Sequence, residues 1–151
     1  MRKHLLALLL LAALGVASAH AHLQASTPAA DALIAAADAP TVISLEFTEG
    51  VELAFSTFRL VRIENELDPT EATYAMRLNA LGAQKASEVL ASRAEVEGEV
   101  AVSLEPTRGT LESFELHLAE PLPAGSYALV WRVLSVDTHI IEEFITFTVL
   151  P

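Results

Sequence analysis

Hydrophobic and polar residues alternate along much of the chain, which is the pattern of strands that bury one face. Ile43, Leu45 and Phe47, for example, fall on one face of such a segment, and polar residues fall between them. Turn-forming residues at 48–50 and 122–125 interrupt the alternating runs. The pattern predicts an all-β fold, a sandwich or a Greek-key barrel, with strands over 41–48, 55–63, 100–104, 112–118, 126–134 and 142–149.

The central part of the chain departs from this pattern. Asp68 is a favourable N-cap, Pro69 suits the first helical position, and Glu71 suits the third. The residues that follow are rich in Ala, Leu, Met, Gln and Glu, which favour helix. We therefore predict a short helical insertion around 69–92, made of one or two helical turns or short helices, with a break at Gly82. Its apolar residues are expected to pack on the sandwich: Met76, Leu78, Leu81, Val89 and Leu90.

The first nineteen residues predict an export signal. Arg2 and Lys3 precede an uncharged apolar run over 5–16, and the small residues at 17–19 match a signal-peptidase site. The apolar run is shorter than the roughly 20 residues that a membrane-spanning helix needs. We predict cleavage after Ala19, so that 1–19 is removed and 20–151 forms one domain. An uncleaved N-terminal anchor is the alternative.

Composition narrows the functions that this chain can have. It has 151 residues, no cysteine, and 9 Lys and Arg against 20 Asp and Glu, for a formal net charge of −11. The length predicts a single domain. Without cysteine the chain has no disulfide, no thiolate zinc site and no cysteine nucleophile. The acidic balance argues against a nucleic-acid partner, because phosphate backbones require a basic face.

The histidines carry the candidate chemistry. Cleavage after Ala19 would give His20 a free α-amine beside its imidazole, and these two nitrogens can chelate one metal ion. Nitrogen ligands in a tetragonal arrangement favour Cu(II). His22 follows two residues later. His117 shares the polar face of its strand with Glu115, so we expect an exposed histidine with no metal role.

A second group of candidate ligands follows an apolar strand near the other end of the chain. Asp137 and His139 are two residues apart, so in extended backbone their side chains would project from one face. A carboxylate and an imidazole placed in this way can ligate one metal, or one can orient the other. A surface ion pair is the commoner explanation of this spacing. The position at a strand end would allow the pair to meet the N-terminus.

Three segments resemble the small exported copper-resistance proteins of the CopC family. They are the start of the mature chain over 20–28, the segment Leu-Glu-Phe-Thr-Glu-Gly-Val over 45–51, and the stretch over 122–139 that ends in Asp-Thr-His. The resemblance implies an immunoglobulin-like Greek-key β-barrel of about seven strands that binds Cu(II) in the periplasm. It covers both ends of the mature domain.

Residue by residue, the resemblance places copper on the amine and imidazole of His20, with His139 opposite and Asp137 as a further ligand. Glu49 matches an acidic residue of the family and would be an outer ligand or a hydrogen-bond partner of the bound water or amine. A solvated turn carboxylate beside Gly50 is the alternative for Glu49.

The chain also departs from the family pattern in three places. The region over 65–99 is longer than usual, and residues 140–144 stand where members of the family tend to have Pro and Gly. His22 creates a competing site, because an amine, two deprotonated backbone amides and its imidazole form a square-planar Cu(II) chelate without a folded protein. Met76 is alone outside the signal, so no methionine-rich Cu(I) site is expected.

The expected function is a periplasmic Cu(II) carrier or buffer that passes copper to an inner-membrane transport partner and is not an enzyme. A copper-dependent oxidative enzyme is one alternative, but such enzymes hold their polysaccharide on exposed aromatic residues. Most aromatic residues of this chain fall at core positions, so no polysaccharide partner is expected. A metal-free immunoglobulin-like interaction domain is the other alternative.

Overall fold

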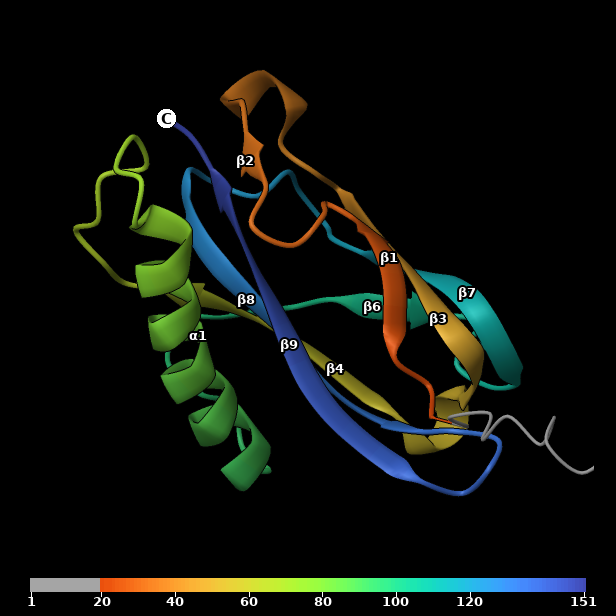
Figure 1. Cartoon of the computed structure of the whole chain (residues 1–151). Helices are drawn as coiled ribbons and strands as arrows, with labels where there is room; N and C mark the ends of the chain where they lie inside the picture. Colours follow the sequence, from red (N-terminus) through yellow and green to blue (C-terminus); the bar gives the residue numbers. More distant parts are fainter. Residues whose placement is uncertain (1–19) are drawn as a thin grey trace, which may run out of the picture.

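The computed structural model describes residues 20–151, and the predicted export signal over 1–19 lies outside them. The described chain folds into two β-sheets that pack face to face, with one helix on the outer face of the second sheet (Figure 1). Within this part of the chain, no helix is long and apolar enough to cross a membrane.

The first sheet contains four strands and the second contains five. The order in the first is β1 (Leu23–Thr27), β3 (Val42–Glu52), β7 (Thr110–His117) and β6 (Ser103–Glu105). The order in the second is β2 (Leu33–Ile34), β9 (Ile140–Val149), β8 (Gly125–Leu134), β4 (Thr57–Ile63) and β5 (Glu99–Val100). Short 3₁₀ turns cover Ala36–Asp38 and Leu53–Phe55.

The strand connections are those of a Greek-key sandwich, because neighbours within each sheet are mostly distant in sequence. All strand pairs are antiparallel except β2 with β9. The described strands form two separate open sheets, so the sandwich and not the barrel is the form that this chain adopts. Two of the nine strands found within residues 20–151, β2 and β5, are only two residues long.

The core lies between the sheets and confirms the alternating pattern. Ile43, Leu45 and Phe47 are each at most 2% exposed. Phe47 stacks on Phe114 with ring centroids 5.7 Å apart and meets the edge of Trp131 at 6.0 Å. This packing fixes the face that β3 and β8 turn inward.

Several details of the predicted strands are wrong. The strand predicted over 100–104 is divided between the sheets, because β5 ends at Val100 in the second sheet and β6 begins at Ser103 in the first. Residues 48–50 do not form a turn: β3 continues through them to Glu52, with an irregular register against β7 between Glu46 and Val51. The strand β1 has no predicted counterpart, because its sequence Leu-Gln-Ala-Ser-Thr alternates weakly and none of its residues is fully buried.

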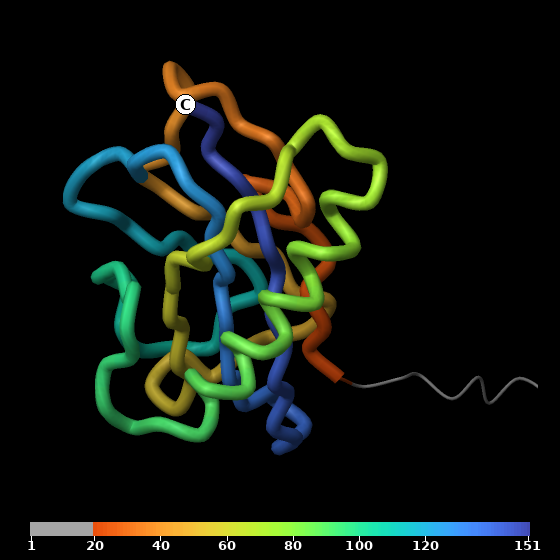
Figure 2. The backbone as a smooth tube through the Cα atoms, turned by 90° about the vertical axis from the view of Figure 1, so that its left-hand side faces the viewer, coloured from red at the N-terminus to blue at the C-terminus, as the bar shows by residue number. Residues whose placement is uncertain are grey.

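The helical insertion is longer and more regular than predicted. The helix α1 (Tyr74–Ala91) is a single helix of 18 residues that lies against β8, β9 and β4, as the two views show (Figures 1 and 2). It begins later than Pro69, because the Asp68 carboxylate accepts hydrogen bonds from the amide and hydroxyl of Thr70 and so closes a turn before the helix.

Gly82 does not break the helix but allows it to approach the sheet. A Cβ added at Gly82 would lie 2.5 Å from Thr146 Cγ2 and 3.0 Å from Phe144 Cε2, both on β9. Leu78 and Val89 are buried as predicted, whereas Met76 is 67% exposed and faces away from the sandwich. A glycine inside a helix therefore marks close packing here and not an end.

Candidate metal centre

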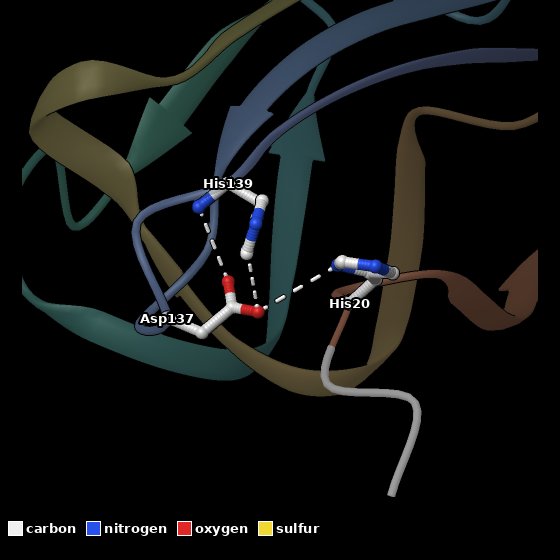
Figure 3. Close-up of side chains that lie close together, drawn as sticks. All are labelled: His20, Asp137 and His139. Carbon is white, nitrogen blue, oxygen red and sulfur yellow. Dashed lines mark hydrogen bonds and ion pairs between the residues drawn. The ribbon is translucent and has the colours of Figure 1, made fainter. Parts of the chain in front are cut away.

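Three predicted ligands meet where the start of the described chain reaches the turn between β8 and β9 (Figure 3). His20 lies just before β1, and Asp137 and His139 lie in the turn. Each of the three offers a ligand atom, and these atoms all lie within 4.8 Å of one another. The rings of His20 and His139 meet edge to face with centroids 4.7 Å apart.

The turn, and not extended backbone, brings Asp137 and His139 together. Ser135 forms a bridge to Val51 of β3, and the chain then reverses through Thr138, whose φ is 72°. Asp137 accepts a hydrogen bond from the backbone amide of His139 at 3.2 Å. The predicted closeness of the two side chains thus has a different cause, since an Asp that bonds the amide two residues later closes a turn.

Asp137 is held as an anion. Its Oδ1 accepts a hydrogen bond from the Ser135 hydroxyl, and its Oδ2 lies 2.8 Å from Nδ1 of His139. These contacts, first that of Ser135 and then those of His139, lower the pKa of the Asp137 carboxyl from 3.8 to about 2. An ionised carboxylate therefore faces the two imidazoles over the whole physiological pH range.

Strand β3 holds the N-terminal segment in place. The Thr48 hydroxyl donates to the carbonyl of His20 at 2.9 Å and accepts from the amide of His22 at 3.1 Å. The Thr48 amide donates to the carbonyl of His22 at 2.9 Å. Ala21, between the two histidines, is fully buried in the core. His20 is thus positioned by β3 and points its ring at the turn.

The Nδ1 atom of His20 fits a metal ligand better than a structural group. It is buried and has no hydrogen-bond partner among residues 20–151. Asp137 Oδ2 is 3.6 Å away, which is too long for a hydrogen bond. Buried polar atoms are normally paired. A metal ion held between this nitrogen, the carboxylate and the second imidazole would give Nδ1 of His20 the partner that it lacks.

Glu49 falls outside this group of three. It belongs to β3 and directly follows Thr48, and its Oε2 is buried without a hydrogen-bond partner in the described part of the chain. Glu49 therefore lies within a strand and not in the turn that the alternative assumed, and its role toward a metal stays a prediction. Its Oε2 is available to a donor that comes with the N-terminus or with a bound ligand.

The two remaining histidines of the described chain lie apart from the group. His22 turns toward β9, where its Nδ1 lies 2.9 Å from Glu143 Oε1, and its ring centroid is 6.1 Å from that of His20. The side chain of His117 is 41% exposed on the first sheet, beside Glu115, as expected. Thr48, Ser135 and Glu143 were missed as site residues, because hydroxyls and carboxylates at those positions carry no local signal.

Two imidazoles and a carboxylate lie together at one end of this open β-sandwich, and side chains of these types are able to ligate a metal ion. A family model described as the CopC domain matches residues 23–150. The chain therefore belongs to the CopC family, whose members are copper-binding resistance proteins of the periplasm.

Relatives of known name support the same family. Copper resistance protein C of Escherichia coli is 33% identical over 133 residues, which cover 88% of this chain and 83% of that protein. Protein YobA of Escherichia coli is 31% identical over 131 residues, covering 87% of this chain and 79% of that protein.

Solved structures agree with the fold. PcoC, a methionine-rich copper resistance protein from Escherichia coli, is similar with a TM-score of 0.57 and 30% identity, over 87% of this chain and 99% of PcoC. CopC from Methylosinus trichosporium is similar with a TM-score of 0.55 and 25% identity, over 87% of this chain and 95% of that one.

Proposed function

We propose that this protein binds one Cu(II) ion in the periplasm between its mature N-terminus and the β8–β9 turn, and carries it to an inner-membrane transport partner. The observation that carries the proposal is the buried, unpartnered Nδ1 of His20, which faces an ionised Asp137 and the ring of His139. Membership of a copper-binding family supports copper as the ion.

Each ligand has a distinct role. Cleavage after Ala19 frees the α-amine of His20, which then chelates the ion together with Nδ1 of the same residue. His139 supplies the opposite imidazole nitrogen. Asp137 supplies a carboxylate oxygen and, through its 2.8 Å contact with Nδ1, orients the His139 ring. Glu49 accepts a hydrogen bond from the α-amine or from a bound water, which would pair its buried Oε2.

Carriage and buffering suit this site better than oxidative catalysis. An anionic carboxylate among the ligands disfavours an open redox position on copper. Polymer-degrading copper enzymes also need several exposed aromatic residues. Among residues 20–151 the side chain of Phe55 is exposed, at 72%, whereas Trp131, Tyr74 and Tyr127 are at most 6% exposed. The side chain of His139 is 61% exposed, so an accepting ligand from a partner reaches the ion from that side.

The test is a Cu(II) titration of the correctly processed protein, followed by EPR spectroscopy, with two variants. His139→Ala removes one ligand, and a variant with an extra residue before His20 removes the chelating amine. Both are expected to lose the tight one-equivalent site. His117→Ala is the matched control, since His117 lies on the first sheet, and it should bind as the parent does.

Two results would contradict the proposal. Unchanged tight binding by His139→Ala, with a four-nitrogen spectrum, would assign copper to the peptide chelate of residues 20–22. No copper uptake by the processed protein would leave the metal-free interaction domain as the explanation of the fold.

A further inference from the structure

The competing chelate at the N-terminus draws on four nitrogen atoms of residues 20–22. They are the α-amine of His20, the deprotonated amides of Ala21 and His22, and Nδ1 of His22, arranged in a square around one Cu(II) ion. All four must turn toward a common point. The structure shows what three of these atoms do when the chain is folded.

The imidazole nitrogen that the chelate needs is already occupied. Nδ1 of His22 lies 2.9 Å from Oε1 of Glu143. When the ring donates the Nδ1 proton to this carboxylate, that nitrogen has no lone pair left for a metal. Glu143 stands on β9 opposite Trp131 of β8, in the ladder between two long strands. Its position is therefore set by the sheet and not by the N-terminal segment.

The fold also restrains the two backbone amides: that of His22 is hydrogen-bonded, and that of Ala21 belongs to a buried residue. The amide of His22 donates to the hydroxyl of Thr48 at 3.1 Å and lies 2.8 Å from the carbonyl of His20. Ala21 is 0% exposed, so its amide is buried and out of reach of a metal ion in solution. Formation of the chelate would require both amide protons to leave, Ala21 to come out of the core, and the contacts of Thr48 to break.

We infer that Thr48 and Glu143 are positioning residues that keep His22 out of copper coordination and so direct the ion to His20, Asp137 and His139. The two residues belong to different sheets, Thr48 to β3 and Glu143 to β9. Thr48 accepts a hydrogen bond from the amide of His22, and Glu143 contacts its ring. This inference rests on the proposed function, because it presumes the folded site as the destination of the ion.

The test removes both contacts and observes the ligands of copper. In the processed Thr48→Val/Glu143→Ala variant, the four-nitrogen component of the Cu(II) EPR spectrum is expected to rise by roughly tenfold or more, since a charge-assisted hydrogen bond and a backbone contact are lost together. Addition of His139→Ala to this variant should no longer weaken binding. Addition of His22→Ala should abolish the new component.

Matched controls separate positioning from general damage. Glu142→Ala alters the neighbouring carboxylate, which pairs with Arg132 and not with His22, and should keep the parent spectrum. Thr48→Ser keeps the hydroxyl and should also behave as the parent. Near-ultraviolet circular dichroism of the buried Trp131 reports whether each variant is folded. If the double variant is unfolded, the single variants Glu143→Ala and Thr48→Val take its place in the same measurements.

The outcomes distinguish this inference from the proposed function. A folded double variant that keeps the parent spectrum and still depends on His139 would overturn the positioning role and leave the copper site intact. A parent protein that already shows the four-nitrogen spectrum, without dependence on His139, would overturn the proposed function itself.

Discussion

Among single residues, Asp137 shows most clearly how the site obtains its charge. The carboxylate accepts bonds from the Ser135 hydroxyl and from the amide of His139, and it contacts the His139 ring. All of these contacts favour the ionised form, so the pKa of Asp137 is lowered by Ser135 and His139 and by no lysine or arginine of residues 20–151. The turn thus prepares an anion before a metal arrives.

We predict that Ser135→Ala raises the pKa of Asp137 from about 2 toward its ordinary value of 3.8 in the copper-free protein, because the bond from Ser135 is the largest cause of the shift. The measurement is the carboxyl carbon chemical shift of Asp137 against pH by NMR. Ser103→Ala, on the other sheet, is the control. An unchanged midpoint in Ser135→Ala would contradict this origin of the shift.

Proton linkage decides how the low pKa of Asp137 changes the stability of the fold with pH. A carboxyl whose pKa is lower in the folded state stabilises the fold above its unfolded pKa, and this contribution disappears as the pH falls through the folded value. For Asp137 the window therefore lies between about pH 4 and about pH 2. Acidification within that window should weaken the β8–β9 turn in the parent more than in Ser135→Ala.

Among the elements, the helix α1 is held to the sheet by a glycine and by an arginine. Gly82 lets the helix axis approach β9. Arg59 of β4 bonds the carbonyls of Val89, Ser92 and Ala94 at the end of the helix, and it pairs with Glu99 of β5 through two further bonds. The five N–H donors of the guanidinium are thereby all used.

Gly82→Ala is expected to destabilise the protein by about 1–3 kcal/mol, because the added methyl would meet Thr146 and Phe144. The higher helix propensity of Ala, worth ~1 kcal/mol, offsets part of this cost. Urea unfolding measures the net effect. The control is Ala83→Gly on the exposed side of the helix. It should lower the free energy of unfolding only by the difference in helix propensity between Ala and Gly. A stabilised Gly82→Ala protein would show that helix and sheet are not in close contact.

Arg59→Met should cost roughly 2–3 kcal/mol at neutral pH, since it removes the five hydrogen bonds that Arg59 donates to three carbonyls and to the largely buried Glu99 carboxylate. The hydrogen bonds from Arg59 lower the pKa of Glu99 below 4.5, so the stabilisation by the pair is present above that pH and is lost on acidification.

Urea unfolding of the parent and of Arg59→Met at pH 7 and at pH 3 tests both statements. The difference between the two proteins should shrink at the lower pH. Arg77→Met is the control, because Arg77 and Glu71 form an exposed pair, and it should have little effect at either pH. An equal difference at both pH values would argue against the charged pair as the source of the stabilisation.

At the scale of the whole molecule, the candidate copper site joins the two sheets. His20 leads into β1 of the first sheet, and Asp137 and His139 connect two strands of the second. The sheets are open at their edges. An ion held between these residues would therefore form a clasp, that is, a link between the two sheets at one end of the sandwich (Figures 1 and 3). Binding that requires the fold must stabilise the fold.

We predict that Cu(II) raises the melting temperature of the processed protein by several degrees, since free ligand at a hundred times its Kd contributes about 2.7 kcal/mol. The unfolded chain can still bind copper through the peptide chelate of residues 20–22, and this binding reduces the rise in melting temperature. His22→Ala removes that chelate and should therefore increase the copper-induced shift, although it loses the contact with Glu143.

Calorimetry with and without copper measures the shift for each protein. His139→Ala provides the comparison, because it keeps the chelate and loses the clasp, and its shift should be close to zero or negative. A copper-induced shift in His139→Ala as large as in the parent would contradict the clasp.

Much of the architecture could be predicted from local sequence. The alternation around Ile43, Leu45 and Phe47 is enough to place a strand and its buried face, because side chains in a strand alternate between two environments. The positions of His20, Asp137 and His139 at chain and strand ends were sufficient to name them as candidates. Their role as ligands remains a prediction.

Other features depended on contacts between residues distant in sequence. From the sequence alone, Gly82 is a residue that would be expected to end a helix. Only its close approach to β9 explains why a glycine stands inside this helix. The turn at Asp137 depends on the bridge from Ser135 to Val51, 84 positions before it along the chain. Neither contact leaves a pattern in the nearby sequence, because each joins two segments that are far apart along the chain.

By itself, the sequence determined the class of fold, the family and the short set of side chains able to bind a metal, because periodicity and residue chemistry are local properties. The tertiary structure decided which of these side chains meet. It brings His20 to Asp137 and His139, and it turns His22 away toward Glu143. Convergence of this kind requires the packing of two sheets, which sets distances between residues that are more than 110 positions apart.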